Sequence, residues 1–425
     1  MLKFPYALND FDAIISEGYF YVDRTSHIPL IENAGSQLLF LRPRRFGKTL
    51  LLSMLENYYD VAKAEQFERL FGHLAIGQNP TPEHNQYFVM TWDFSKISFE
   101  GKVRNIQKAL YHYINKRIQA FARYYQAWLP FDIEIEPKDA VASFLSLLMA
   151  VKFSQYPLYL LVDEYDSFAN ELIMGSRKNS SNRRDLLLSY GDALRALFRT
   201  VKSATSGRGL ERVFITGVSP VLFSDIRIGY NVAESIFEEG KFNDLCGFRE
   251  SEMALALNQI AIECDFPPDK AQQALTAMQN VYKGYCFSYQ LTEFVYHPTL
   301  AIDLLFYFQT NCQAPPQRLD EHLTTEKEII SYISNKPYGE ALIVQALDEE
   351  PPLSLRDFVN DRGVQEILRE TIGRSFMMSL LYYFGALTLV GETEFGELVL
   401  KIPNLAVRQL YVDRYLTVTH PKSSV

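Results

Sequence analysis

The chain has 425 residues, of which 48% are hydrophobic and 22% charged. This composition is ordinary for a globular protein and excludes a disordered or collagen-like one. The length predicts roughly two to three domains. A net charge of −9 argues against broad, nonspecific binding of nucleic acid, which usually accompanies a surplus of basic residues. A local basic patch remains compatible with that charge, because a net value says nothing about distribution.

Cysteine usage and hydropathy predict a soluble cytoplasmic protein with no membrane partner. The cysteines lie far apart without metal-binding spacing, and we expect all of them to be free thiols: Cys246, Cys264, Cys286 and Cys312. The N-terminus contains Asp10 and Asp12 and lacks the apolar core of a signal peptide. The longest apolar stretch, residues 376–390, is broken by Ser379 and Gly385 and falls short of the ~18 residues of a spanning helix. It predicts a buried helix followed by a strand.

The first half of the chain alternates between strand and helix patterns. Residues 18–32 predict a short aromatic strand that runs into a helix. Further strands are predicted where β-forming or apolar runs occur, at residues 37–41, 87–94, 157–162 and 212–216. Helices are predicted from residue 48 onward and at residues 103–125 and 186–202, with a polar loop at 175–184. This alternation indicates an α/β fold, with a parallel sheet and helices on both faces.

After about residue 250 the pattern changes. Residues 251–281 and 326–346 predict helices, and residues 353–402 predict two helices followed by a β-hairpin. The order at the end of the chain is typical of a winged-helix-like module. We therefore expect three parts: a sheet domain over residues 1–250, a helical region over 251–345, and a winged-helix-like module over 346–425.

Residues 42–49, Arg-Pro-Arg-Arg-Phe-Gly-Lys-Thr, resemble a phosphate-binding loop between a strand and a helix. The consensus is Gly, four residues, then Gly-Lys-Ser/Thr, and Arg42 replaces its first glycine. The chemistry needs backbone amides at a helix N-terminus, a lysine for phosphate charge and a hydroxyl for Mg²⁺. We predict that the nucleotide is bound by Arg44, Arg45, Phe46, Gly47, Lys48 and Thr49. The Gly-Lys-Thr tripeptide alone is equally compatible with a surface turn.

A second motif strengthens this interpretation. Asp163 and Glu164 follow the apolar strand predicted at residues 157–162. In P-loop ATPases the first carboxylate holds Mg²⁺, and the second polarises the attacking water. The alternative is a strand end at which acidic residues cap the next helix. Because the pair follows the loop by about a hundred residues, with one strand between them, the two motifs together favour an NTPase in which Thr49 and Asp163 hold the metal.

The strand predicted at residues 212–216 offers a candidate sensor. A polar residue at its end would contact the γ-phosphate; Thr216 is the first choice and Ser219 the second. The alternative is a tight turn at Gly217, capped by Thr216.

Charge that develops on the phosphoryl group favours an arginine nearby. The candidates flank the loop or the sensor strand: Arg42, Arg44, Arg45, Arg208, Arg212 and Arg227. Arg45 is favoured because it lies inside the loop. For each arginine taken alone, a solvated surface charge is the simpler interpretation.

Several short motifs occur in one order, at residues 21–25, 41–49, 162–166, 216–220, 242–248, 282–287 and 401–404. They resemble the bacterial AAA-ATPase-like family, whose members often carry a C-terminal restriction-endonuclease-like nuclease domain. Arg42 is then an expected feature, since the loop of this family begins that way. The chain stops soon after residues 401–404, where the nuclease domain would usually begin, so we expect no nuclease activity.

The resemblance implies ATP and Mg²⁺ as cofactors and a winged-helix-like end. It also implies an ASCE-type core, in which a strand is inserted between the two Walker motifs, residues 42–49 and 158–164. Residues 1–250 would then be an AAA-like P-loop ATPase domain. The leading hypothesis is an ATPase that couples its nucleotide state to movement of the C-terminal helices. The alternatives are a nucleotide-dependent switch without turnover and, more weakly, a DNA-associated regulator. A protein partner or self-association is compatible with each of them.

Overall fold

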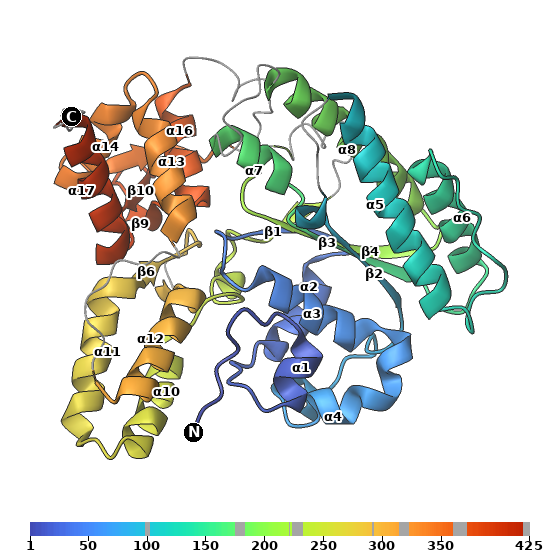
Figure 1. Ribbon diagram of the computed structural model, residues 1–425, viewed down its shortest axis with the longest axis horizontal. Helices are drawn as coiled ribbons and strands as arrows, with labels where there is room; N and C mark the ends of the chain where they lie inside the picture. Colours follow the sequence, from blue (N-terminus) through green and yellow to red (C-terminus); the bar gives the residue numbers. More distant parts are fainter. Residues whose placement is uncertain are drawn as a thin grey trace, which may run out of the picture.

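The centre of the molecule is a five-stranded parallel sheet (Figure 1). The computed structural model describes residues 1–97, 103–174, 183–220, 222, 233–290, 293–313, 323–359 and 372–419. The strand order is β2-β3-β4-β1-β5, with β1 at Gln37–Leu41, β2 at Phe88–Asp93, β3 at Leu158–Asp163, β4 at Leu210–Gly217 and β5 at Glu234–Ser235. Since β4 lies between β1 and β3, the inserted strand implied by the family resemblance is present.

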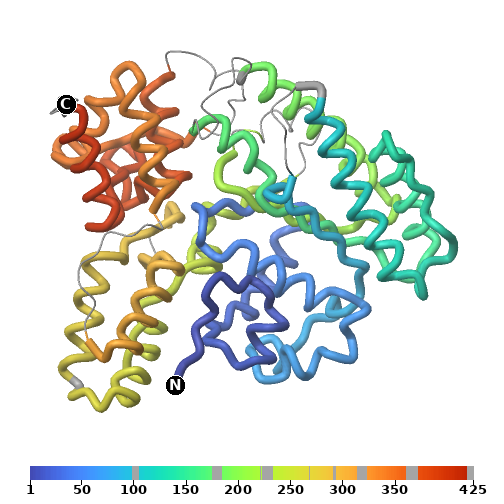
Figure 2. The backbone as a smooth tube through the Cα atoms, in the orientation of Figure 1, coloured from blue at the N-terminus to red at the C-terminus, as the bar shows by residue number. Residues whose placement is uncertain are grey.

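Helices cover both faces of this sheet, as predicted (Figures 1 and 2). One face carries α1 (Phe11–Ser16), α2 (Ile28–Ala34), α3 (Lys48–Tyr59) and α4 (Phe67–Phe71). The other face carries α5 (Val103–Tyr124), α6 (Ala140–Lys152), α7 (Ser167–Met174) and α8 (Arg183–Ala204). Every residue of β1 and β3 is buried, which is why their sequences are nearly continuous apolar runs.

The C-terminal part lies to one side of the sheet in two groups of elements (Figure 1). The first group contains α10 (Glu250–Glu263), α11 (Pro268–Tyr282) and α12 (Pro298–Asn311), with the short strands β6 (Lys283–Tyr285) and β7 (Val295–Tyr296). The second contains α13 (Thr324–Ser334), α14 (Gly339–Asp348), β8 (Leu353–Leu355), α16 (Arg374–Tyr383), β9 (Thr388–Glu392), β10 (Leu398–Lys401) and α17 (Leu405–Thr419).

The hairpin predicted near the end of the chain is confirmed by β9 and β10, which pair antiparallel. The helix predicted to begin at residue 353 is wrong at its start. Leu353 and Leu355 are buried in β8, which pairs with β10, so their alternation with Ser354 follows a strand period. The remainder of that prediction falls partly on residues 360–371, which lie outside the described ranges, as does most of the polar loop at 175–184.

The strand predicted within residues 18–32 is also wrong. The amides of Tyr19 and Phe20 donate to the carbonyls of Ile14 and Lys3, and this segment forms no strand ladder with any part of the chain that the structure describes. The carboxylate of Asp23 then accepts from the backbone of the following turn, which starts a short 3₁₀-helix before α2. Local capping by a polar side chain here outweighs the β propensity of the aromatic residues.

The expectation of four free thiols is wrong. Cys264 follows α10 and Cys312 follows α12, and the two form a disulfide with Cα atoms 5.7 Å apart. The two helices pack against each other, which brings residues 48 positions apart into contact. Cys246 and Cys286 are buried and take no part in this disulfide. Within the described residues, no helix is long and apolar enough to cross a membrane.

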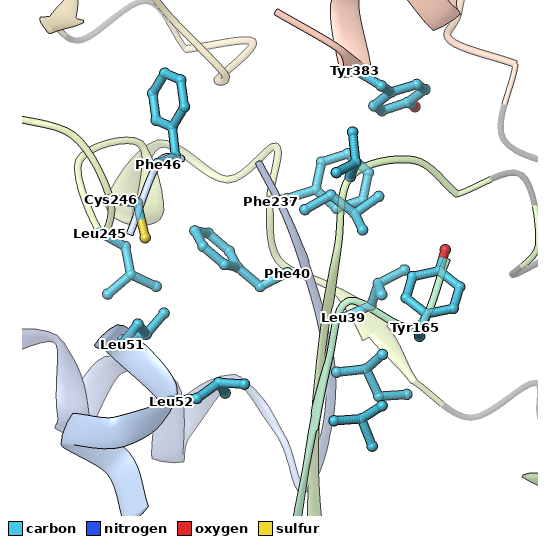
Figure 3. Packing of buried hydrophobic residues seen from close by; sticks show 14 of the residues in the cluster. Leu39, Phe40, Phe46, Leu51, Leu52, Tyr165, Phe237, Leu245, Cys246 and Tyr383 are labelled. Atoms are coloured by element: carbon cyan, nitrogen blue, oxygen red, sulfur yellow. The ribbon is translucent and has the colours of Figure 1, made fainter. Parts of the chain in front are cut away.

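The hydrophobic core continues from the sheet into the C-terminal part. Figure 3 shows Phe40 of β1, Phe237 and Tyr383 of α16 along this path. The rings of Phe237 and Tyr383 meet edge to face, with centroids 6.0 Å apart. Because buried aromatic contacts of this kind resist separation, the carboxyl edge of the sheet and the C-terminal part are held close together.

Candidate nucleotide-binding site

The loop between β1 and α3 has the backbone shape of an anion cradle. Arg45 and Gly47 adopt positive φ angles, 63° and 93°. Gly47 is the residue immediately before α3, and this left-handed conformation favours glycine because it lacks a Cβ atom. The amides at the start of α3 have no partner inside the helix and can donate to phosphate oxygens.

Lys48 is buried beneath this loop, with 3% of its surface exposed. Its Nζ atom donates to the carbonyl oxygens of Arg42 and Pro43, each at 3.0 Å. A third partner is the Oε1 atom of Glu164, at 3.2 Å. The two carbonyls fix the ammonium at the loop, whereas the carboxylate is a partner that phosphate oxygens could replace.

Asp163 lies at the end of β3 between two hydroxyl groups. Thr49 donates to its Oδ2 atom at 2.7 Å, and Thr216 donates to its Oδ1 atom at 2.6 Å. Burial raises the pKa of Asp163, and the neighbouring charge of Glu164 raises it further. Adjacent hydroxyl and carboxylate oxygens are the hard ligands that Mg²⁺ takes, usually with only one or two protein groups and the substrate phosphates completing the shell. The donor set at Thr49 and Asp163 fits that ion.

Glu164 has an unusual backbone conformation for its residue type, with φ 50°. Non-glycine residues adopt positive φ rarely, and such strain is concentrated at functional sites. The turn is held by the amide of Tyr165, which donates to the carbonyl of Thr216, and by that of Ser167, which donates to Glu164. The result directs the Glu164 carboxylate toward Lys48 rather than toward Thr216, and 17% of that side chain remains exposed.

A pocket of about 790 Å³ opens in front of these residues. Its polar end is lined by the loop, and its size lies within the range typical of nucleotide-sized ligands. Apolar residues from the N-terminal and C-terminal parts of the chain also line the pocket: Pro5, Leu8, Phe20, Tyr21, Phe248 and Ile302. This combination of a cationic end and an aromatic wall suits a phosphate chain joined to a flat base.

Phe46 is among the residues that line the pocket, and its ring packs against three buried rings of the C-terminal part. Its ring is 1% exposed and lies against the rings of Tyr285, Phe287 and His297, with centroid distances of 5.1, 5.4 and 4.7 Å. Figure 3 shows this ring turned away from Leu51 of α3. We therefore assign the side chain to packing, where it fastens the loop to the C-terminal part.

Arg42 is neither a surface charge nor an arginine finger, and both interpretations are wrong. Its guanidinium group is fully buried and donates to the carbonyls of Leu41, Phe237 and Phe242 at 2.8, 2.9 and 2.7 Å. It also lies over the ring of Phe287, 4.1 Å from the centroid. Burial lowers the pKa of Arg42 to about 10. The position needs this side chain because it joins the loop to a segment some 200 residues away.

Two further arginine candidates lie at the wrong edge of the sheet. Arg212 is near the amino end of β4, where it pairs with Glu83 at 2.6 Å. Arg208 precedes the same strand end. The carboxyl end of β4 faces the loop, so neither side chain lies at the pocket. Arg44 and Arg45 do line the pocket, while Arg227 lies outside the described residues.

Ser219, the second choice for a sensor, does not reach the site. Its amide and hydroxyl donate to Asp166, at 2.7 and 3.3 Å, and it is fully buried. Thr216 does reach Asp163, but its hydroxyl contacts the carboxylate from the buried side. This geometry supports a positioning role for Thr216, and contact with a γ-phosphate stays a prediction.

Sequence reasoning gave no role to the motifs at residues 21–25 and 242–248, and the structure joins them. Arg24 donates to the carbonyls of Asp244 and Gly247 at 2.7 and 2.8 Å and pairs with Glu252 at 2.6 Å. The two segments flank the pocket. The only signal in the sequence was the presence of the motifs themselves, which did not reveal that they contact each other.

The fold and this site define a nucleotide-binding protein of the P-loop ATPase class. A family model described as "Predicted AAA-ATPase" matches residues 5–227, which is more than half of the chain. The chain belongs to this family, and the resemblance inferred from the motifs is confirmed.

A protein of Azotobacter chroococcum mcd 1, described as an uncharacterized protein in the vnfD 5′ region, is 26% identical over 323 residues. The match covers 72% of this chain and 52% of that protein, so the chain spans about half the length of the curated relative it matches. Among solved structures, the Walker-type ATPase PABY2304 of Pyrococcus abyssi matches with a TM-score of 0.48 and 14% identity, over 97% of this chain and 98% of that one. Cdc6p from Pyrobaculum aerophilum matches with a TM-score of 0.36 and 12% identity, over 95% and 97%. These structural likenesses are distant, and no inference rests on them.

Proposed function

We propose that the protein is a Mg²⁺-dependent ATPase whose nucleotide state is coupled to the position of its C-terminal part. One observation carries this proposal. The hydroxyl of Thr49, the carboxylate of Asp163 and the hydroxyl of Thr216 form one hydrogen-bonded line, with distances of 2.7 and 2.6 Å, beside the buried ammonium of Lys48. A chance Gly-Lys-Thr turn has no reason to meet a buried aspartate at the end of another parallel strand, two positions away in the same sheet.

The residues divide the chemistry between them. Lys48 places a positive charge where the β- and γ-phosphates would lie. Thr49 and Asp163 would hold Mg²⁺, which neutralises charge on the phosphate oxygens. Thr216 fixes the orientation of the Asp163 carboxylate through its hydrogen bond. Glu164 is the candidate that polarises the attacking water, and it must leave Lys48 to do so, because the two side chains are paired at 3.2 Å.

Coupling to the C-terminal part is supported by contacts at the rear of the loop. The hydroxyl of Thr299, at the start of α12, donates to the carbonyl of Arg45 at 3.0 Å. Phe46 packs among rings of the same region. Because these contacts join the loop directly to α12, a shift of the loop on phosphate binding would be passed to that helix.

The test compares ATP binding and phosphate release in the wild type, Lys48→Ala and Glu164→Gln. Lys116→Ala, which removes an exposed lysine from α5, is the matched control. We expect release to be lost in both site variants, with binding retained in Glu164→Gln, and no change in the control. Equal release by the wild type and Lys48→Ala would refute the enzymatic half of the proposal.

One observation favours the second candidate, a nucleotide-dependent switch without turnover. Glu164, the candidate that would polarise the attacking water, is paired with Lys48 at 3.2 Å. If that pair persists with ATP bound, the protein would bind the nucleotide and not hydrolyse it. ATP would then raise the melting temperature of the wild type, but not of Lys48→Ala, while phosphate release stayed at background.

The three-part division at residues 250 and 345, with a winged-helix-like final module, is also a proposal. The final module is supported by the order β8, α16, β9, β10 and by the sheet order β8-β10-β9, whereas the boundary at residue 345 falls within α14. Association with DNA through this module is tested by a gel shift with salt titration, since phosphate contacts weaken steeply as salt rises. Absence of binding at low salt would remove the idea.

A further inference from the structure

The outward side of α6 has the composition of a buried surface. The inner side of this helix packs on α5 and α8 and buries Phe144 and Leu147. On the outward side, Leu145 is 41% exposed and Met149 is 51% exposed. All of α6 lies within the described residues, and its one exposed polar residue is Lys152, in the last turn. A surface helix ordinarily has a polar outward face, and a helix that is apolar on every side is usually covered.

Two exposed aromatic rings extend this apolar surface beyond the helix. Phe153 directly follows α6, one turn after Met149, and is 63% exposed. Its ring lies 6.2 Å from the ring of Phe131, which is 46% exposed. The amide of Glu134 donates to the hydroxyl of Ser146 at 2.8 Å, so the segment after Phe131 is fastened to the helix. We call these four residues the α6 patch: Phe131, Leu145, Met149 and Phe153.

The size of the α6 patch matches the apolar part of a protein–protein interface. Because an aromatic side chain has about 150–250 Å² of surface, the exposed fractions of the four residues amount to roughly 450 Å². A standard interface covers about 800 Å² of each partner and is about 56–65% apolar, which is roughly 450–520 Å². Aromatic residues and methionine are also enriched at interfaces. On α10, by contrast, the exposed Leu255 and Ile262 are separated by the exposed polar residues Asn258 and Gln259.

The α6 patch is separate from the nucleotide pocket. Figure 1 shows α6 at the edge of the molecule opposite the C-terminal part. The residues that line the pocket include none from α6. A partner bound to the patch therefore has no direct contact with the phosphate loop.

A second copy of the same chain fits this face. The protein has a net charge of −9, so two copies repel each other except where uncharged surfaces or opposite charges meet. Two-fold dimers are the commonest oligomers, and their interfaces are self-complementary. With the two-fold axis between Leu145 and Met149, the two α6 helices run antiparallel, and Leu145 of each copy faces Met149 of the other. Lys152 of each copy then lies within about one turn of Asp139, the exposed residue at the start of the other helix.

We propose that the protein forms a two-fold symmetric dimer through the α6 patch, with the two α6 helices antiparallel. Leu145 packs on Met149 of the second copy, and Lys152 pairs with Asp139 of the second copy. The apolar contact supplies the affinity, because it removes the patch from water. The charge pair fixes the direction of the helices, since a parallel arrangement would place the two Asp139 carboxylates together and the two Lys152 ammonium groups together.

Sedimentation velocity between about 1 and 100 µM tests the dimer, since standard interfaces give dissociation constants of micromolar or below. We expect the wild type to dimerise, and Leu145→Glu and Met149→Lys each to raise the dissociation constant by about 10- to 100-fold, because each places a charge against an apolar side chain. Leu255→Lys, at a side chain that is 72% exposed on α10, should dimerise like the wild type. Circular dichroism checks that each variant folds. A wild type that stays monomeric, or variants that dimerise as tightly as the wild type, would overturn the proposal.

Mixing the two variants tests the antiparallel arrangement. In the mixed dimer, the carboxylate introduced at position 145 faces the ammonium introduced at position 149, and the native Met149 faces the native Leu145. The mixture should therefore dimerise at least about tenfold more tightly than either variant alone. A mixture that dimerises no more tightly than its components would show that the two side chains do not face each other, and the proposal would fail. None of these measurements uses nucleotide, so they are independent of the proposed ATPase function.

Discussion

The two sides of the phosphate loop each carry a buried cation held by backbone carbonyls, but only one of the two cations also has a carboxylate partner. On the rear side, Arg42 is 1% exposed and is held by backbone carbonyls of residues 41, 237 and 242. On the pocket side, Lys48 is 3% exposed and has two carbonyl partners and one carboxylate partner, Glu164. Carbonyls of packed segments cannot leave, whereas a side-chain carboxylate can. The rear of the loop is thus fixed, and its front has a partner that a ligand can displace.

The residue types suit these two tasks. A guanidinium group is planar, always charged and rich in donors, so it can satisfy several carbonyls from different segments at once. An ammonium group is a compact point charge on a flexible stem, and it can exchange one partner for a phosphate oxygen with little rearrangement. The comparison teaches that a buried positive charge near a nucleotide site is not by itself evidence of ligand contact.

The largest expected effect is on stability and comes from Arg42, at the rear of the phosphate loop. Arg42→Met leaves the carbonyls of Phe237 and Phe242 without their donor, and we expect the free energy of unfolding to fall by about 3–5 kcal/mol. Urea denaturation followed by circular dichroism measures this loss. Arg123→Met, which removes an exposed arginine of α5, should change it by less than about 0.5 kcal/mol. A stable Arg42→Met protein would show that the rear side is not fixed.

The next largest effect is on phosphate release and comes from Lys48, at the front of the phosphate loop. Lys48→Met should lower phosphate release by about 100- to 1,000-fold, because a preorganised charge opposite the transferring phosphoryl group is lost. The same variant also leaves the carbonyls of Arg42 and Pro43 without a donor, so its free energy of unfolding should fall by about 1–3 kcal/mol, which is less than in Arg42→Met because water in the pocket can reach this side of the loop. Measuring phosphate release and the free energy of unfolding in Lys48→Met and Arg42→Met distinguishes the role of the front of the loop from that of its rear. Similar losses of stability in the two variants would remove the distinction.

A smaller effect is expected where the loop packs against the C-terminal part. Phe46→Leu removes the ring contacts with Tyr285 and His297, so it should lower the free energy of unfolding by about 1–2 kcal/mol. If the ring also transmits nucleotide state, the increase in melting temperature caused by ATP should shrink in this variant. Phe395→Leu, at a ring that is 92% exposed, serves as the control. A neutral Phe46→Leu would mean that the aromatic contact is dispensable.

The smallest effect concerns the hydroxyl behind the metal ligand. Thr216→Val keeps the shape of the side chain and removes its hydrogen bond to Asp163, which is worth about 1 kcal/mol. The Mg²⁺ concentration for half-maximal phosphate release should rise by about tenfold, as expected when a group that orients a metal ligand is lost. Thr276→Val, on the exposed face of α11, should leave it unchanged. A change in ATP affinity without a change in Mg²⁺ dependence would instead support the γ-phosphate sensor.

The sequence by itself determined the sheet, the loop and the front of the site. Apolar runs predict β1 and β3, and the spacing of apolar residues predicts α3. Because the carboxyl ends of parallel strands lie at the same edge of a sheet, the sequence also predicts that Lys48, Thr49 and Asp163 lie close together. Two segments were assigned wrongly, one because of a local hydrogen bond and the other because of a distant strand. The segment at residues 18–24 became a loop through its own capping group, and Leu353–Leu355 became a strand because β10 pairs with it.

Only the tertiary structure decided the rear of the site. The partners of Arg42 are 195 and 200 residues away, and Phe46 packs on rings more than 200 residues away. The disulfide of Cys264 and Cys312 likewise depends on the packing of α10 against α12. Periodicity and capping are local properties of a chain, and they can be inferred from neighbouring residues. The burial of a charge and the identity of its partner depend on which distant segments pack together, and no local pattern records that.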